Sequence, residues 1–133
     1  MAWLYNGSYC QEEYLNLHSV PHCITTKKAG NIRNEKHRLE FFGFLSKERV
    51  FKHDFSSKQI FYGEQVHGNN CSIAEKGKNN PKFNLVPLAD GLYTNDSECL
   101  IGVFTADCLP LFILDTDKKC TALVHAGWRS AKD

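Results

Sequence analysis

Three residues with metal-binding side chains lie at or beside the ends of apolar segments that we expect to be strands. They are His67, Cys108 and His125. Two imidazoles and a thiolate suit zinc, with the fourth coordination position left to water. However, 41 residues separate His67 from Cys108 and 17 separate Cys108 from His125, so the local spacing of a zinc finger is missing. A lone His at a strand end is more commonly a hydrogen-bonded surface residue, so spacing alone leaves the site open.

The elements that must position these residues can be read from the hydrophobic pattern. Residues 31–42 are predicted to form a helix with Ile32, Leu39, Phe42 and Leu45 on its apolar stripe, and Gly43 as its stop. The expected strands cover residues 58–67, 71–75, 100–105, 109–114 and 120–125, with a polar loop over 76–82 and a turn over 115–118. In the first of these strands, Gln65 and His67 are expected to share one face, because side chains alternate. The pattern predicts an α+β fold with a mixed or antiparallel sheet covered on both faces.

Composition excludes several classes of protein. The chain has 133 residues and a formal net charge of +1, whereas a nucleic-acid binder usually carries a strong basic excess. No apolar run approaches the roughly 20 residues of a membrane-spanning helix, and residues 1–10 do not resemble a secretory signal. We therefore expect one domain over residues 1–133 in the cytoplasm, with mostly free thiols, and with neither nucleic acid nor membrane as a partner.

Four ordered motifs carry a family resemblance. They are Gln65-Val66-His67-Gly68, Ala89–Thr94 (ADGLYT), Thr105–Pro110 (TADCLP) and His125–Arg129 (HAGWR). In this order and with these gaps, the chain resembles the laccase-domain family, also called the multicopper polyphenol oxidase or YfiH-like family. The segments His22–Gly30 and Asn34–Phe44 are similar to the family's N-terminal motif and following helix. The resemblance implies sheets covered by helices, in the layer order α-β-β-α.

The resemblance also implies a site and an activity. It places the metal ligands at His67, Cys108 and His125, with zinc as the expected ion and copper as a substitute. The implied reactions are phosphorolysis of adenosine, inosine, guanosine and methylthioadenosine, and deamination of adenosine. Purine nucleosides and phosphate are thus the expected partners. Oxidation of phenols is expected only as a copper-dependent side activity, because a multicopper oxidase needs many His, often in His-x-His pairs, and the chain has six His and no such pair.

Neighbours of the expected ligands receive roles in this hypothesis. Asp107 is a candidate proton carrier or an ordinary turn residue, and Gln65 is a candidate for orienting the substrate or a ligand. Arg129 is a candidate phosphate ligand or a surface ion-pair partner, because its planar fork matches two oxygens. Trp128 is expected in the core, and Asp90 is expected to be structural.

The chain also departs from the family pattern. Lys27 stands where an Arg is expected, Ala29-Gly30 replaces a Gly-Gly pair, and Ser130 replaces a Gly. The chain stops at Asp133, whereas family members continue, so the resemblance is to the N-terminal portion and the fold is expected to be truncated. We therefore expect either a missing C-terminal segment or a homo-oligomer.

Two other functions remain open from the sequence. The first is a metal-free Cys–His hydrolase or amidase acting on peptidoglycan precursors, with Cys108 as nucleophile and His125 or His67 as base. The second is an inactive fragment or binding module. Cysteine alkylation in the presence of zinc or a chelator would separate a metal ligand from a catalytic thiolate.

Overall fold

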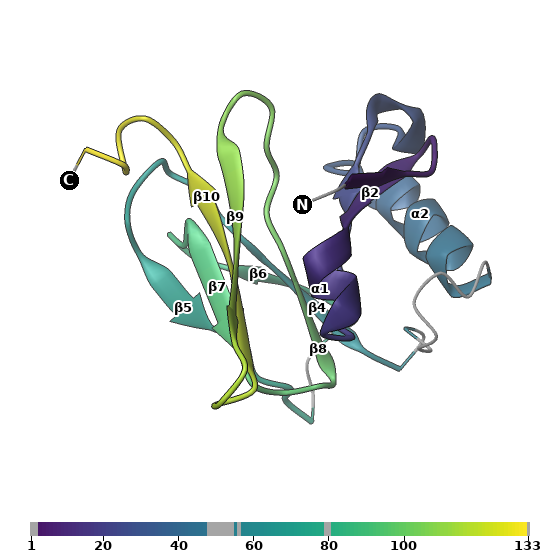
Figure 1. The fold of residues 1–133 in the computed structure, drawn as a ribbon. Coiled ribbons are helices and arrows are strands. Elements are labelled where there is room, and N and C mark those ends of the chain that lie inside the picture. Colours follow the sequence, from purple (N-terminus) through teal and green to yellow (C-terminus); the bar gives the residue numbers. More distant parts are fainter. Residues whose placement is uncertain (1–2, 48–54, 56, 79–80, 133) are drawn as a thin grey trace. The chain divides into compact units, whose positions relative to one another are not determined.

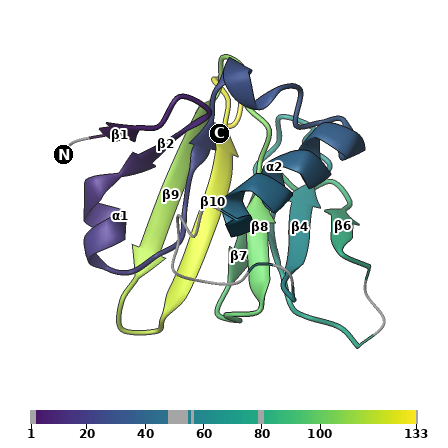
Figure 2. The ribbon, with the colours of Figure 1, turned by 90° about the vertical axis from the view of Figure 1, so that its right-hand side faces the viewer.

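The computed structural model describes residues 3–47, 55, 57–78 and 81–132. The chain divides into two compact units, Met1–Ser56 and Ser57–Asp133. Within these described ranges, both α-helices lie in the first unit and two sheets lie in the second (Figures 1 and 2). The predicted α+β class with mixed sheets is confirmed. One domain over residues 1–133 stays a prediction, because a compact unit need not be an independent domain.

The first unit contains a small antiparallel sheet and two α-helices. Strands β1 (Trp3–Tyr5), β2 (Tyr9–Glu12) and β3 (Ile24–Thr25) pair in the order β1-β2-β3. Helix α1 (Glu13–Leu17) follows β2, a 3-10 turn covers Lys27–Ala29, and helix α2 covers Glu35–Lys47. Tyr9, Leu15, Phe41 and Leu45 are buried and supply apolar contacts for this unit.

The predicted helix over residues 31–42 is displaced toward the C-terminus. The side-chain oxygen of Asn34 accepts a hydrogen bond from the amide of His37 at 3.3 Å, which caps the helix just before Glu35. Gly43 was wrongly expected to be the stop, because the helix continues past it and buries Leu45. Leu39 was wrongly placed on the apolar stripe, since half of its surface is exposed and Phe41 is buried instead.

The second unit is built from two packed sheets. One sheet has the order β5-β7-β10-β9, with β5 (Cys71–Ile73) parallel to β7 (Gly91–Thr94) and the pairs of β10 (Cys120–Ala126) with β7 and β9 (Leu109–Asp115) antiparallel. The other has the order β6-β4-β8, all parallel, from β6 (Phe83–Val86), β4 (Gln59–Gly63) and β8 (Cys99–Gly102). Phe61, Ala74, Ala89, Leu92 and Cys99 form the core of this unit. These sheets supply the two β layers of the expected arrangement.

The strand predictions in this unit are mostly confirmed within a few residues. The turn after β9 is confirmed, and the side chain of Asp115 accepts hydrogen bonds from the amides of Asp117 and Lys118. Strand β6 was not predicted. The strand expected over 58–67 ends at Gly63, so Gln65 and His67 lie beyond it and do not share a strand face. Gly63 has no room for a side chain, because a Cβ there would lie 2.0 Å from the carbonyl oxygen of Ala89.

All six cysteines are free thiols. Burial raises the pKa of the Cys23 thiol to about 12 and that of the Cys99 thiol to about 11, so neither forms a thiolate near neutral pH. Among the described residues, no helix is both long and apolar enough to cross a membrane.

Candidate metal centre

The structure brings the three predicted metal ligands together. One ligand atom from each of His67, Cys108 and His125 lies within 4.8 Å of the other two. The two imidazole rings meet edge to face, with their centroids 4.9 Å apart. His125 is buried, Cys108 is partly buried and His67 is exposed, so the cluster lies at the border between the core and solvent.

Strand pairing explains why Cys108 meets His125. In the antiparallel ladder between β9 and β10, Leu109 pairs with Ala126 and Pro110 pairs with His125. Cys108 directly precedes β9, so it lies beside the end of β10 at which His125 is found. Gly127 follows, and a Cβ there would lie 3.3 Å from the sulfur of Cys108 and 3.5 Å from Cδ2 of His67. A glycine at this position therefore leaves room for the side chains of Cys108 and His67.

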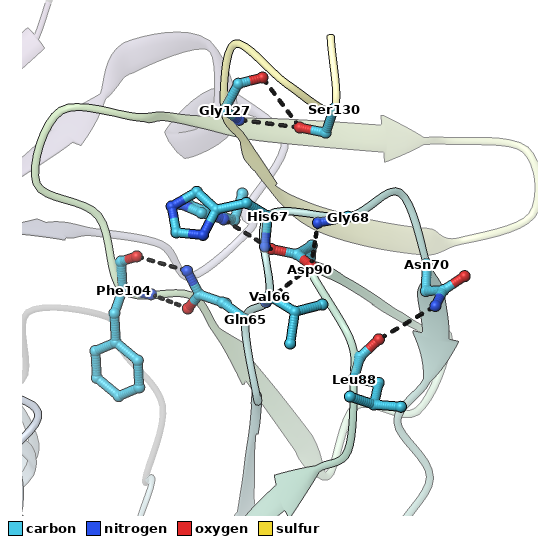
Figure 3. A network of polar contacts seen from close by, with 11 residues as sticks. Gln65, Val66, His67, Gly68, Asn70, Leu88, Asp90, Phe104, Gly127 and Ser130 are labelled. Atoms are coloured by element: carbon cyan, nitrogen blue, oxygen red, sulfur yellow. Dashed lines mark hydrogen bonds and ion pairs between the residues drawn. The ribbon is translucent and has the colours of Figure 1, made fainter. Parts of the chain in front are cut away.

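Asp90 connects the two histidines. Figure 3 shows its carboxylate beside the backbone of His67 and Gly68. Its Oδ1 accepts from the amide of His67 at 2.9 Å and lies 2.9 Å from Nδ1 of His125. Its Oδ2 accepts from the amides of Val66 at 3.1 Å and Gly68 at 2.8 Å. The sequence analysis expected Asp90 to be structural and missed this link. An acid directly before an apolar segment, followed by Gly91, was the available signal in the sequence.

The environment of Asp90 favours its ionised form. Only 1% of its surface is exposed, and burial alone acts to raise the pKa of its carboxyl group. The hydrogen bond with His125 and those from the amides of Gly68, Val66 and His67 outweigh burial and hold this pKa below its ordinary value. A negative charge therefore lies directly behind the ligand cluster.

The side-chain amide of Gln65 forms two hydrogen bonds with the backbone of a neighbouring segment. Its Nε2 donates to the carbonyl oxygen of Phe104 at 2.7 Å, and its Oε1 accepts from the amide of Phe104 at 2.7 Å (Figure 3). Phe104 lies four residues before Cys108, so this pair of bonds ties the segment before Cys108 to the segment before His67. Both ends of the amide are engaged, so this geometry favours support of the site over contact with a substrate.

The other predicted residues lie on exposed segments. Asp107 is exposed in the bend before β9, next to Cys108. Arg129 is exposed, and its guanidinium carbon lies 5.5 Å from the ring centroid of Trp128. Trp128 was wrongly expected in the core, because 75% of its surface is exposed. Ser130, which departs from the family pattern, holds the turn by accepting from the amide of Gly127 and donating to its carbonyl.

A cavity of about 220 Å³ is lined by neighbours of the ligands in the chain, although none of the three ligands lines it. Its lining includes Gly68, Asp90 and Ala126, and Leu111 and Val124 give it an apolar wall. Val124 and Ala126 alternate with His125 along β10, so the wall of this cavity and the buried imidazole lie on opposite faces of the strand.

The donor set fits a single metal ion. With bonds of about 2.0–2.3 Å, tetrahedral zinc holds nitrogen and sulfur ligands about 3.3–3.7 Å apart. The three ligand atoms lie within 4.8 Å of one another, so each pair needs to approach by at most about 1.5 Å to reach that spacing. Among the described residues, this is the one group of three or more His, Cys, Asp or Glu side chains arranged to hold a metal.

Comparisons with known proteins agree on one family. The profile described as multi-copper polyphenol oxidoreductase laccase matches residues 46–133. The chain is 33% identical over 85 residues to a purine nucleoside phosphorylase of Clostridium acetobutylicum, covering 64% of this chain and 34% of that protein. It is 27% identical over 128 residues to the purine nucleoside phosphorylase YlmD of Bacillus subtilis, covering 93% and 42%. The crystal structure of YlmD from Geobacillus stearothermophilus matches with a TM-score of 0.58 and 27% identity, over 72% of this chain and 36% of that chain. The chain therefore spans about two fifths or less of the length of these relatives.

Proposed function

The chain belongs to the family of multi-copper polyphenol oxidoreductase laccases, and on that premise we propose that it is part or all of a zinc-dependent purine nucleoside enzyme. The proposed reactions are phosphorolysis of adenosine, inosine, guanosine and methylthioadenosine, and deamination of adenosine. The observation that carries the proposal is the convergence of His67, Cys108 and His125, whose ligand atoms lie within 4.8 Å of one another. Relatives named purine nucleoside phosphorylases support the substrate class.

The residues of the cluster have distinct tasks in this proposal. His67, Cys108 and His125 hold the ion, and bound zinc would supply Lewis acidity and a water that ionises near neutral pH. Asp107 carries a proton to or from the reacting group, since its exposed carboxyl is the acidic group next to Cys108 in the chain. Arg129 binds phosphate through its planar fork, and its exposed position leaves it accessible to an anion. Gln65 holds the segment before Cys108 in place through Phe104.

A single ion is proposed in place of a copper cluster. A multicopper oxidase requires several metal sites, whereas the described residues contain one group of the required kind. Copper outranks zinc in affinity for nitrogen and sulfur donors, so it would occupy the same three ligands and account for phenol oxidation as a side activity.

Metal analysis and product identification test this function together. The purified chain is analysed for bound metal and then incubated with adenosine and with inosine, each with and without phosphate, and the products are identified by mass. We expect ribose 1-phosphate and free base only with phosphate, and inosine from adenosine in either case. His67→Ala and Cys108→Ala should lose both metal and turnover, while Cys71→Ser, an exposed thiol of the same unit, should keep both. Retention of metal and turnover by the first two variants would contradict the assignment.

A metal-free hydrolase is a second candidate, and one contact favours it. Asp90 lies 2.9 Å from Nδ1 of His125, which is the arrangement of an orienting acid behind a general base, and the thiol of Cys108 belongs to the same cluster. Under this alternative the thiolate of Cys108 attacks the carbonyl carbon of an amide in a peptidoglycan precursor, and the C–N bond breaks as the base histidine protonates the leaving amine. Water then hydrolyses the resulting thioester and frees the thiol. A chelator separates the two functions, because it should abolish the zinc-dependent reaction and leave a thiolate reaction intact.

A further inference from the structure

We propose that Asp90 is a positioning residue that holds His67 and His125 in ligand geometry before any metal binds. The inference rests on the proposed function, in that it takes these two residues as metal ligands. Asp90 itself is not proposed to touch the ion or the substrate. Its carboxylate lies behind the cluster and contacts the two segments that carry the imidazoles.

The first task of Asp90 is to hold the loop that carries His67. His67 has a φ of 61°, a left-handed conformation that a non-glycine residue rarely adopts. The consecutive amides of Val66, His67 and Gly68 all donate to the Asp90 carboxylate, at 3.1, 2.9 and 2.8 Å. Three amides directed at one anion stabilise this turn, because the charge-assisted bonds offset the unfavourable conformation. Loss of the anion should therefore allow His67 to leave this conformation.

The second task is to select the tautomer of His125. Nδ1 of His125 lies 2.9 Å from an Asp90 oxygen, and that carboxylate accepts hydrogen bonds in its ionised form. The neutral imidazole must therefore carry its proton on Nδ1, which leaves the lone pair of Nε2 available to a metal. Carboxylates behind ligating histidines act in this way in many metal sites.

One oxygen serves both tasks, and this couples two ligands that are 58 residues apart in the sequence. Oδ1 of Asp90 receives both the His67 amide and the His125 ring nitrogen. A change at Asp90 should therefore alter both ligands together. Asp96 offers a contrast within the same unit, because its carboxylate accepts from the amides of Glu98 and Lys76 and from the thiol of Cys99, and bonds neither histidine.

Zinc affinity of matched variants tests the proposal. In Asp90→Asn, an NH₂ donor replaces one of the two carboxylate oxygens. Depending on the orientation of the new amide, the lost acceptor is Oδ2, which serves the amides of Val66 and Gly68, or Oδ1, which serves His67 and His125. Asp96→Asn makes the same chemical change at a carboxylate away from the cluster. We expect Asp90→Asn to weaken Zn²⁺ binding by about 10- to 100-fold, measured by competition with a chromophoric chelator, and Asp96→Asn to stay within about threefold of the parent chain. Equal affinities for the parent chain and Asp90→Asn would overturn the proposal, as would equal losses in both variants.

Spectroscopy separates positioning from a general loss of structure. With Co²⁺ in place of zinc, Asp90→Asn should change the visible ligand-field spectrum while its far-ultraviolet circular dichroism stays that of the parent chain. If Asp90→Asn does not fold, nitrogen NMR of the metal-free parent chain decides the matter. We expect the proton of His125 on Nδ1; a proton on Nε2 would overturn the proposal.

Failure of this inference and failure of the proposed function give different results. If the parent chain binds zinc but acts on no purine nucleoside, the proposed reaction is wrong, and the effect of Asp90→Asn on zinc affinity still tests the positioning role. If nucleosides are converted and Asp90→Asn binds zinc as tightly as the parent chain, the function stands and the role of Asp90 is wrong.

Discussion

The two faces of the sheet β5-β7-β10-β9 differ sharply in burial. The face toward the core carries Leu92, Leu123 and His125, with exposed fractions of 1%, 9% and 3%. The opposite face carries Leu111 and Ile113 of β9, which are 45% and 54% exposed. Ladder register places Ile73, Tyr93 and Ala122 in one row with Ile113, and Cys71, Gly91 and Val124 in one row with Leu111. None of these outward residues is charged.

This difference shows that hydrophobic character alone does not identify the core of this sheet. Both faces are apolar, so an alternating pattern is absent and the sequence reads as a strand covered on both sides. The inward face packs on β4 and β8 and supports the ligand cluster at its edge, because His125 shares that face with Leu123. Substitutions on the two faces should therefore have unequal effects, which the following predictions measure.

The largest contrast is expected between two leucines on neighbouring strands. Leu123→Ala leaves a cavity in the buried face and should lower the free energy of unfolding by about 2–5 kcal/mol. Leu111→Ala removes the same atoms from the exposed face and should cost no more than about 0.5 kcal/mol. Urea denaturation followed by circular dichroism gives both values. Equal losses would mean that the outward face is as well packed as the core.

The next contrast concerns glycines near and away from the ligand cluster. Gly127→Ala places a methyl group 3.3 Å from the sulfur of Cys108, so the ligand must shift, and we expect zinc affinity to fall by about tenfold. Gly102→Ala is the control, since the nearest atom to its added methyl lies at 3.9 Å. Chelator competition measures both. Unchanged affinity in Gly127→Ala would show that the cluster has spare room.

Acid should weaken the inward face through Asp90. The pKa of this carboxyl group is lower in the folded chain than its ordinary value of 3.8, so the stability it contributes is present above that value. That contribution is lost as the pH falls through the lower, folded pKa. We expect the urea midpoint of the parent chain to drop steeply below about pH 4 and that of Asp90→Asn, which starts lower, to drop less. Parallel pH profiles would show that Asp90 does not supply this dependence.

The smallest effect on stability is expected on the outward face. Ile113→Lys places a charge on the exposed edge strand β9 and should change the free energy of unfolding by less than about 0.5 kcal/mol. It should also reduce binding of a hydrophobic fluorescent dye, because the apolar patch is interrupted. Zinc affinity should stay at that of the parent chain. A fall in zinc affinity would show that the two faces are coupled.

Much of the strand layout could be predicted because local pattern and turn chemistry agree in this half of the chain. Asp115 to Lys118 were recognisable as a turn, and the flanking apolar runs became β9 and β10. The helix near residue 40 was placed too early, because the cap at Asn34 and the burial of Leu45 outweighed the helix-breaking tendency of Gly43. The strand after residue 58 was extended too far, since the close approach of Gly63 to Ala89 and the turn toward Asp90 depend on partners distant in sequence.

Residue types and ordered motifs by themselves determined the family and the three residues to examine as ligands, because His and Cys carry metal-binding atoms wherever they lie. Tertiary structure alone decided that those atoms meet, that the side chain of Gln65 bonds the backbone of Phe104, and that Asp90 links His67 to His125. The physical reason is that these contacts join segments 17 to 58 residues apart. Strand register and chain reversal bring such segments together, and no local pattern in the sequence records that geometry.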